Sequence, residues 1–221
     1  IYSASDFYYL LRTTNAGTTW VLQDSGSYPF MVDVAFAKAD PDLAISVGYG
    51  GIIRRSTDGG FTWTGVPSGA SEDFVKVDFT GSMSVTAIGA FGVIRRSDDG
   101  GILWTGEPRL NTDRIYGITF TSLTIGLIVM GNVVYQTTDA GLTWEPRVTG
   151  TTNVLYDIKF WGSNRGLAVG WNGTIIRTVN GGGIWTVQSS PTTQSLHGIA
   201  TIGTMTAVAI GQNGRIIRTT D

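Results

Sequence analysis

Short runs of β-branched and aromatic residues, rather than helical periods, dominate the pattern of apolar positions along the chain. One set of runs reads VDVAFA (32–37), VKVDFT (75–80), YGITF (116–120), YDIKF (156–160) and HGIAT (197–201). A second set lies between residues 43 and 211 and reads LAISVG, SVTAIG, GLIVMG, GLAVG and TAVAIG. Because Gly, Asn, Asp, Ser and Thr separate these runs, we predict strands joined by tight turns in antiparallel meanders.

Five tryptophans recur in phase with these runs, and each closes the same eight-residue phrase, Ser/Thr-x-Asp/Asn-x-Gly-x-x-Trp. The phrases are TTNAGTTW (13–20), STDGGFTW (56–63), SDDGGILW (97–104), TTDAGLTW (137–144) and TVNGGGIW (178–185). A third set of apolar runs precedes the phrases, at 51–55, 92–96, 132–136, 174–177 and 215–218. Each tryptophan opens a fourth strand, so the repeat contains four strands.

Four short strands per repeat, repeated in series, are typical of a β-propeller, in which neighbouring blades cover the two apolar faces of each sheet. We therefore predict an all-β fold with a single domain over residues 1–221, built from five blades of four antiparallel strands. The segment FYYLLR (7–12) adds a third strand before the first phrase, and the chain stops at Thr219–Asp221 inside a would-be sixth phrase. Both termini are thus expected in one closing blade, with one third strand in surplus. A ring of more than five blades stays open as an alternative.

The phrase itself has a structural explanation. The Asp or Asn side chain can accept backbone N–H groups across a tight turn, and the Gly supplies a positive φ without strain. The Trp is expected to pack between blades. A calcium-binding EF-hand loop would need further acidic residues at fixed positions, which the phrases lack. The structural residues are Asn15, Trp20, Asp58, Trp63, Asp99, Trp104, Asp139, Trp144, Asn180 and Trp185.

These phrases resemble the Asp-box, or bacterial neuraminidase repeat. The longer runs GYGGIIRRSTDGGFTW (48–63) and GWNGTIIRTVNGGGIW (170–185) resemble the repeats of the photosystem II stability and assembly factor propellers. That resemblance implies a protein-binding or assembly role and suggests an arginine patch. Members of that family usually have about seven blades, so this chain is expected to differ from them in ring size.

Composition excludes several classes of function. The net charge of −2 offers no basic footprint for nucleic acid, and the absence of cysteine excludes disulfides and thiolate metal sites. With one histidine and no phosphate-binding motif, we expect no metal and no cofactor. No apolar stretch is long enough for a membrane-spanning helix, which predicts a soluble chain. A start at Ile1 leaves export to the periplasm, a lumen or the extracellular space open.

Enzymatic hydrolysis is not expected. A glycosidase needs two facing carboxylates, and the candidates Asp33, Asp78 and Asp157 lie on first strands near Lys76 and Lys159. We interpret these groups as a mutually neutralising ring around a central axis. The single histidine, His197, is in register with packing positions on the other first strands, namely Val32, Val75, Tyr116 and Tyr156.

Two sets of residues are candidates for binding. The first set lies in irregular loops on the rim opposite the Asp-boxes: Tyr49, Phe91, Trp171, Asn172, Arg109, Arg114 and Arg147. The second is an arginine band directly before the boxes, whose stems we expect to cover sheet edges: Arg12, Arg55, Arg96, Arg177 and Arg218. The predicted function is a non-catalytic propeller that binds a protein partner. A lectin-like carbohydrate binder is the alternative, and a sialidase-like glycoside hydrolase comes third.

Overall fold

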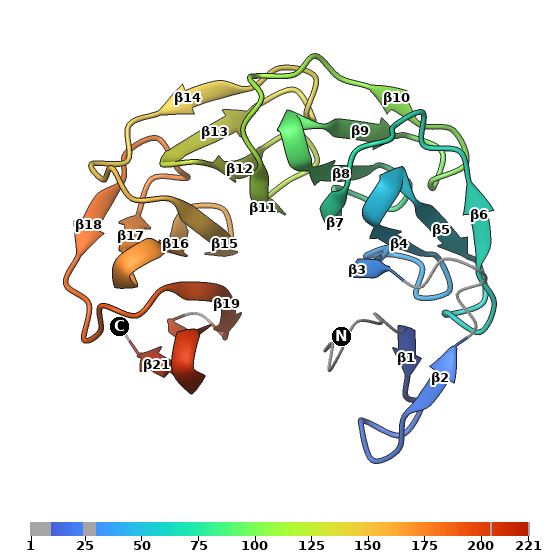
Figure 1. The fold of residues 1–221 in the computed structure, drawn as a ribbon, viewed down its shortest axis with the longest axis horizontal. Helices are drawn as coiled ribbons and strands as arrows, with labels where there is room; N and C mark the ends of the chain where they lie inside the picture. Colours follow the sequence, from blue (N-terminus) through green and yellow to red (C-terminus); the bar gives the residue numbers. More distant parts are fainter. Residues whose placement is uncertain (1–9, 24–29, 204, 221) are drawn as a thin grey trace. The chain divides into compact units, whose positions relative to one another are not determined.

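A computed structural model describes residues 10–23, 30–203 and 205–220 of the chain (Figure 1). The structure is all-β, and its helices are four short 3₁₀ turns: η1 (Tyr49–Gly51), η2 (Ala90–Gly92), η3 (Trp171–Gly173) and η4 (Gln212–Gly214). Within the described ranges, no helix has the length and apolar character needed to cross a membrane. The chain divides into two compact units, residues 1–109 and 110–221.

The first unit contains three antiparallel sheets. A two-stranded sheet pairs β1 (Leu10–Arg12) with β2 (Val21–Gln23). The next sheet contains β3 (Met31–Phe36), β4 (Ala44–Gly48), β5 (Ile53–Ser56) and β6 (Thr64–Val66). The third contains β7 (Phe74–Phe79), β8 (Val85–Gly89), β9 (Ile94–Ser97) and β10 (Thr105–Gly106).

The second unit also contains three sheets, which follow the chain in order in Figure 1. The first contains β11 (Ile115–Phe120), β12 (Gly126–Met130), β13 (Val133–Thr137) and β14 (Glu145–Arg147). The second contains β15 (Leu155–Trp161), β16 (Arg165–Gly170), β17 (Ile175–Thr178) and β18 (Thr186–Gln188). The third contains β19 (Leu196–Ile202), β20 (Thr206–Gly211) and β21 (Ile216–Thr219).

The predicted antiparallel four-stranded meander is confirmed in four of these six sheets. The two sheets nearest the termini are shorter, because β1 and β2 hold the third and fourth strand positions while β19, β20 and β21 hold the first three. Of the predicted terminal strand FYYLLR, the described part is 10–12, and Asp221 of the would-be sixth box lies outside the described residues.

Each Asp-box folds as a closed set of hydrogen bonds around its carboxyl or amide group. In the box at 56–63, Asp58 Oδ1 accepts the backbone N–H groups of Phe61 and Thr62 at 3.0 and 2.9 Å, and its Oδ2 accepts the Thr62 hydroxyl. Ser56 Oγ accepts the N–H of Gly60, whose φ is 82°. The indole N–H of Trp63 then donates to the carbonyl of Gly60 at 3.2 Å. Asn180 accepts the Ile184 N–H in the same way, so an amide oxygen can replace the carboxylate.

Neighbouring sheets within a unit are joined by apolar packing of the box tryptophans. Trp185 is 4 % exposed and belongs to one buried cluster with Leu127 and Val129 of the preceding sheet. Its ring also meets the ring of Phe160 edge to face, at 6.0 Å between centroids. Burying an aromatic side chain in this way contributes strongly to stability, so the box at 178–185 stabilises the contact between its two sheets.

Polar bonds join the same sheets. At three boxes, the residue directly before the box donates from its side chain to the carbonyl of the fourth residue in the next box. The three bonds are Arg12 Nε to Gly59 at 2.8 Å, Arg55 Nε to Gly100 at 2.7 Å and Gln136 Nε2 to Gly181 at 2.7 Å. On the first strands, Asp33 accepts the N–H of Val77 and Asp157 accepts that of Ile199, each at 3.0 Å.

The box carboxylates predict a specific acid sensitivity. Hydrogen bonds from Thr62 and Ser56 lower the pKa of Asp58 to about 2, and bonds from Thr143 and Thr137 do the same for Asp139. Because the folded-state pKa lies below the ordinary value of 3.8, the stabilisation is present above that pH and is lost as the pH falls through about 2. The variant Asp58→Asn/Asp139→Asn should therefore lose less stability than the wild type between pH 4 and pH 2 in chemical denaturation.

The amide boxes at Asn15 and Asn180 provide the natural precedent for this variant. If the wild type and the double variant show parallel loss of stability across this pH range, the box carboxylates do not carry the acid sensitivity.

The packing of the tryptophans makes a second prediction. Trp144 is 7 % exposed, so Trp144→Ala should lower the free energy of unfolding by about 3–5 kcal/mol. Leu142→Ala changes a half-exposed residue of the same box and should stay within about 0.5 kcal/mol of the wild type. EDTA should leave the melting temperature unchanged, and a large calcium-dependent shift would show that the boxes bind metal.

Candidate functional site

The four 3₁₀ turns join the second and third strands of their sheets, and each is fixed to the segment before the first strand. The backbone N–H of Trp171 donates to the carbonyl of Val154 at 2.8 Å, and that of Ala90 donates to Asp73 at the same distance. The glycine before the turn permits this approach, because a Cβ on Gly170 would lie 2.0 Å from the Val154 oxygen. Each turn is therefore a rigid support for the side chains that it carries.

The middle residue of every turn is in the left-handed region, with φ between 52° and 66°: Gly50, Phe91, Asn172 and Asn213. Gly and Asn adopt this conformation readily, whereas an aromatic residue rarely does. Phe91 is nevertheless held there with 60 % of its surface exposed. Strained backbone conformations occur at functional sites, so Phe91 is a candidate binding residue.

In the first unit, the structure brings together Phe91 and Arg109 of the predicted rim set. Arg109 donates to the carbonyl of Phe91 at 3.0 Å and forms an ion pair with Glu72. The hydrogen bond from Arg109 lowers the pKa of the Glu72 carboxyl. Tyr49 stacks on Phe30, with ring centroids 6.1 Å apart. The ion pair with Glu72 therefore fixes Arg109, and Phe91 is the exposed aromatic side chain next to it.

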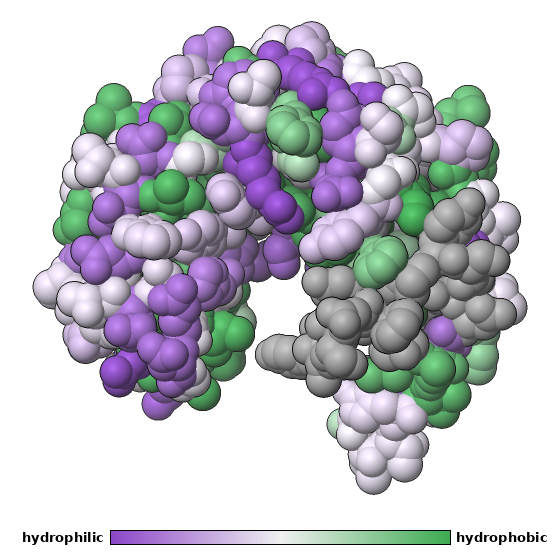
Figure 2. Space-filling model, in the orientation of Figure 1, coloured by the Kyte–Doolittle hydropathy of each residue, from purple (hydrophilic) through white to green (hydrophobic). Residues whose placement is uncertain are grey.

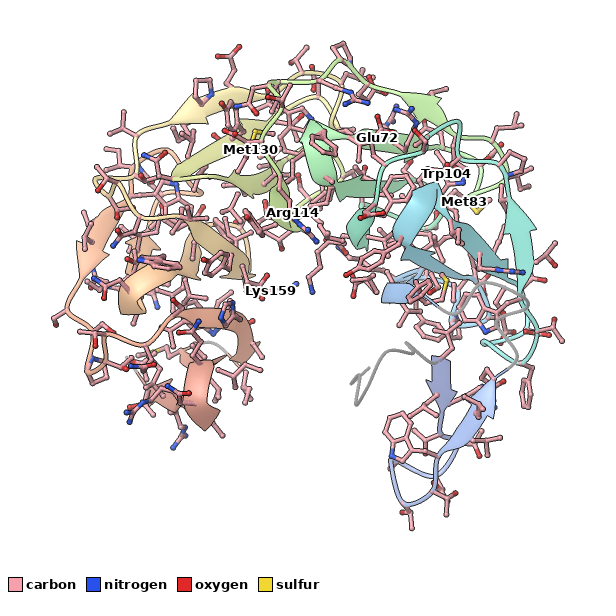
Figure 3. The ribbon with its side chains drawn as sticks, viewed as in Figure 1. Glu72, Met83, Trp104, Arg114, Met130 and Lys159 are labelled. Carbon is pink, nitrogen blue, oxygen red and sulfur yellow. The ribbon has the colours of Figure 1, made fainter. Side chains whose placement is uncertain are left out.

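In the second unit, Trp171 and Asn172 lie in η3, between β16 and β17, and their backbone N–H groups bond to Val154 and Ser195, which directly precede first strands. Trp171 is 54 % exposed, and the backbone N–H of Asn172 donates to Ser195 Oγ at 3.4 Å. Arg114, directly before β11, places its guanidinium carbon 5.8 Å from the centroid of the Tyr116 ring. The first strands form one edge of each sheet, and Figure 3 shows the side chains of Arg114 and Lys159 extending from that edge.

A row of three contacting rings, whose positions sequence analysis interpreted as packing positions, begins next to Arg114. Tyr116 meets Tyr156 edge to face at 5.2 Å, and Tyr156 stacks on His197 at 4.9 Å with 25° between the ring planes. Desolvation by burial, together with the neighbouring Tyr116, raises the pKa of Tyr156. We call Arg114, Tyr116, Tyr156 and His197 the aromatic row.

The aromatic row results from an irregularity that all five first strands share. Each of the five first strands has a β-bulge at its second residue, and the extra residues are Val32, Val75, Tyr116, Tyr156 and His197. A bulge redirects its side chain out of the regular alternation of the strand. The in-phase alignment of these residues was visible in the sequence, but the bulge that re-aims them was not.

The remaining member of the rim set lies elsewhere. Arg147 is on the outer strand β14, where its Nε donates to Gln136 Oε1 on β13 at 3.0 Å. It is half-buried and supports a bond between sheets, because Gln136 itself donates to Gly181. The structure therefore separates Arg147 from the residues near the 3₁₀ turns.

The arginine band is engaged within the fold at several positions. Arg12 and Arg55 donate to the next box, and Arg96 pairs with Asp98 at 2.6 Å. Arg177 and Arg218 line a cavity between the last two sheets of the second unit. Gln136, which interrupts the arginine series in the sequence, makes the same bond as its arginine counterparts.

The acidic residues of the first strands are also engaged. Asp157 is 6 % exposed and accepts the N–H groups of Ile158 and Ile199, while Asp33 accepts the Val77 N–H and lies 3.9 Å from Lys76. Across the part of the chain that the structure describes, no group of three or more His, Asp or Glu side chains could hold a metal ion.

Exposed apolar side chains also occur at the outer ends of the boxes, including Phe61, Leu103 and Ile184. In Figure 2 the apolar residues on the visible face form separate patches among polar ones. Single exposed apolar residues are normal on protein surfaces, so these positions do not define a site.

The family model described as photosynthesis system II assembly factor YCF48 matches residues 12–153, more than half of the chain. The chain belongs to this family of Asp-box propellers. No curated protein sequence matches it.

Solved structures support the propeller fold at low sequence identity. A structure described as YCF48 bound to D1 peptide is 16 % identical to this chain, with a TM-score of 0.59. The match covers 96 % of this chain and 85 % of the chain in that structure. An ancestral GH74 enzyme is also 16 % identical, with a TM-score of 0.74, but this chain spans only 30 % of its length. Virginiamycin B lyase from Staphylococcus aureus is 17 % identical, with a TM-score of 0.68 and coverages of 86 % and 70 %. These similarities concern the fold alone, and two of these structures are enzymes.

Proposed function

We propose that this protein is a non-catalytic propeller that binds a segment of a partner protein at the rim of 3₁₀ turns. The observation that carries the proposal is the aromatic row, in which exposed Arg114 and His197 lie at the two ends of the paired rings of Tyr116 and Tyr156. Exposed Trp171 lies in η3 of the same unit. Aromatic and arginine side chains dominate binding energy at protein interfaces. Membership in an assembly-factor family agrees with a protein partner.

The chemistry of the row favours a peptide segment with an apolar or aromatic side chain and an acceptor oxygen. A partner ring can stack on His197 or Trp171, because both are exposed. Arg114 can at the same time donate to a carbonyl or carboxylate. The related structure of YCF48 holds a peptide, which supports this class of ligand.

Hydrolysis is not part of the proposal. Asp33 and Asp157 already accept backbone N–H groups from neighbouring strands, so they are structural groups rather than a free pair of catalytic carboxylates. The proposal needs no metal and no cofactor.

We further infer that the two units belong to one domain over residues 1–221, a ring of five blades. The closing blade would combine β19–β21 with the N-terminal pair β1–β2, because together these sheets hold all four strand positions. The third position would then be represented twice, by β1 and by β21.

A lectin-like function is the second candidate, because exposed Trp171 beside Asn172 offers a stacking surface next to an amide. A glycan array separates the two candidates. Selective retention of a glycan class, weakened by Trp171→Ala, would favour the lectin.

The rim makes a direct prediction for binding. A peptide selected from a displayed random library against the full chain should bind the double variant Trp171→Ala/Arg114→Ala at least tenfold more weakly in calorimetric titration. Because both side chains are exposed, the melting temperature should stay nearly unchanged.

The matched control is the outer-strand residue Arg147, whose change to Ala should leave the affinity unchanged because it lies apart from the row. If affinity survives the double variant and is abolished by changes at Arg55, Arg96 and Arg177, the arginine band is the site and the assignment to the rim is wrong.

A further inference from the structure

The rings of the aromatic row carry polar atoms that the fold does not use. Within the described residues, the hydroxyl groups of Tyr116 and Tyr156 and the ring nitrogens of His197 form no hydrogen bond to the protein. The rings themselves are held by one another, because Tyr156 lies between the other two at centroid distances of 5.2 and 4.9 Å. A ring with an unpaired polar atom can pack on a ligand side chain and also bond to a polar group. The row is therefore suited to a ligand that is polar as well as apolar.

Two cations lie at the same edge of the second unit. Arg114 directly precedes β11, with its guanidinium carbon 5.8 Å from the centroid of the Tyr116 ring, and Lys159 lies on β15 together with Tyr156. Across the part of the chain that the structure describes, neither Arg114 nor Lys159 forms an ion pair with a carboxylate. Both side chains extend from the edge that the first strands form (Figure 3). This edge therefore presents two positive charges without a counter-charge.

The acid on the same strand does not neutralise Lys159. Asp157 is 6 % exposed, and its Oδ1 and Oδ2 accept the backbone N–H groups of Ile158 and Ile199 at 2.9 and 3.0 Å. These bonds hold the carboxylate inside the sheets, away from the solvent that a ligand comes from. The mutually neutralising ring predicted for the first-strand charges is therefore not formed at Lys159.

An exposed acid, Asp113, directly precedes Arg114 in the chain but does not pair with it. Its side chain lies near the turn that follows β12, where a Cβ on Gly131 would be 3.8 Å from Asp113 Oδ2. Because Asp113 is exposed, water and salt screen its charge. The Arg114 guanidinium is therefore available to a ligand.

We propose that the aromatic row binds an acidic peptide segment, whose carboxylates pair with Arg114 and Lys159 while a neighbouring aromatic side chain packs on Tyr156 or His197. The inference rests on the proposed function, because it takes the row as the binding surface, and it adds the charge of the partner. Arg114 can donate two parallel hydrogen bonds to one carboxylate, and Lys159 supplies a second positive charge.

The two cations also discriminate against other segments. A neutral segment that covered the row would remove water from Arg114 and Lys159 without replacing its interactions, which is unfavourable. A basic segment would be repelled by both charges. Complementary charge therefore favours an acidic partner over a neutral or basic one of the same shape.

Selection from a displayed random peptide library on the full chain, followed by calorimetric titration of the synthesised peptides, tests the charge of the partner. The selected peptides should contain Asp or Glu next to an aromatic residue. Exchange of that acid for Asn or Gln should weaken binding at least tenfold, because the amide cannot pair with a cation. Added sodium chloride should weaken binding of the acidic peptide more than binding of its amide form.

A double-mutant cycle between protein and peptide assigns the charge to Lys159. Lys159→Met removes the cation and keeps an apolar stem, so it should weaken the acidic peptide while leaving the melting temperature nearly unchanged. Its effect and that of the acid-to-amide exchange should be less than additive, because both remove the same pair. Arg165→Met is the matched control, since it removes an exposed cation of the same unit, opposite Trp161 at the other end of β15 from Tyr156. The control should leave the affinity unchanged.

The outcomes separate this inference from the proposed function. Selected peptides that lose affinity on Trp171→Ala/Arg114→Ala but carry no acid, or that bind Lys159→Met as tightly as the wild type, would overturn the acidic segment and leave rim binding in place. An equal loss with Arg165→Met would show that overall charge acts rather than the row, and would overturn the inference as well. Peptides that bind the Trp171→Ala/Arg114→Ala variant unchanged would overturn both proposals.

Discussion

A four-stranded meander of these short strands has two apolar faces, and exposing either face to water is unfavourable. In this chain the boxes at 97–104 and 178–185 meet the constraint by packing on the preceding sheet of their unit, where each places a tryptophan and a glycine against a second-strand residue, Ile45 or Leu127. The buried area supplies the favourable energy. The carbonyl bonds from Arg12, Arg55 and Gln136 fix the geometry.

The sequence was sufficient to predict the strands, their antiparallel order and the structural role of the boxes. The box is a local structure, because Asp58 and Gly60 form their hydrogen bonds within the same eight residues. A short motif is therefore enough to predict its fold. Features that depend on another sheet were harder to predict. The bond from Gln136 to Gly181 spans 45 residues, and the sequence shows only that Gln136 differs from the arginines.

The candidate site was predicted in part, for a related reason. Phe91, Trp171 and Arg114 were recognised because they interrupt the repeat at exposed turns. Tyr116, Tyr156 and His197 were interpreted as packing residues, because in a regular strand their side chains would point onto one face of the sheet and pack there. A one-residue bulge changes their direction. Arg147 illustrates the opposite error, since pairing with Gln136 places it on the outer strand. The propeller fold itself does not decide function, because it supports both assembly factors and enzymes.

Native-state hydrogen exchange at the backbone amides of Val77 and Ile199 tests the central claim, that neighbouring sheets stabilise one another. These two N–H groups donate to Asp33 and Asp157 of the preceding sheet, each at 3.0 Å. If the sheets form one cooperative contact, both amides should exchange only through global unfolding, and their protection should fall in parallel with overall stability as denaturant is added. Exchange of either amide at the rate of an exposed loop amide, while its own strand stays protected, would contradict the account.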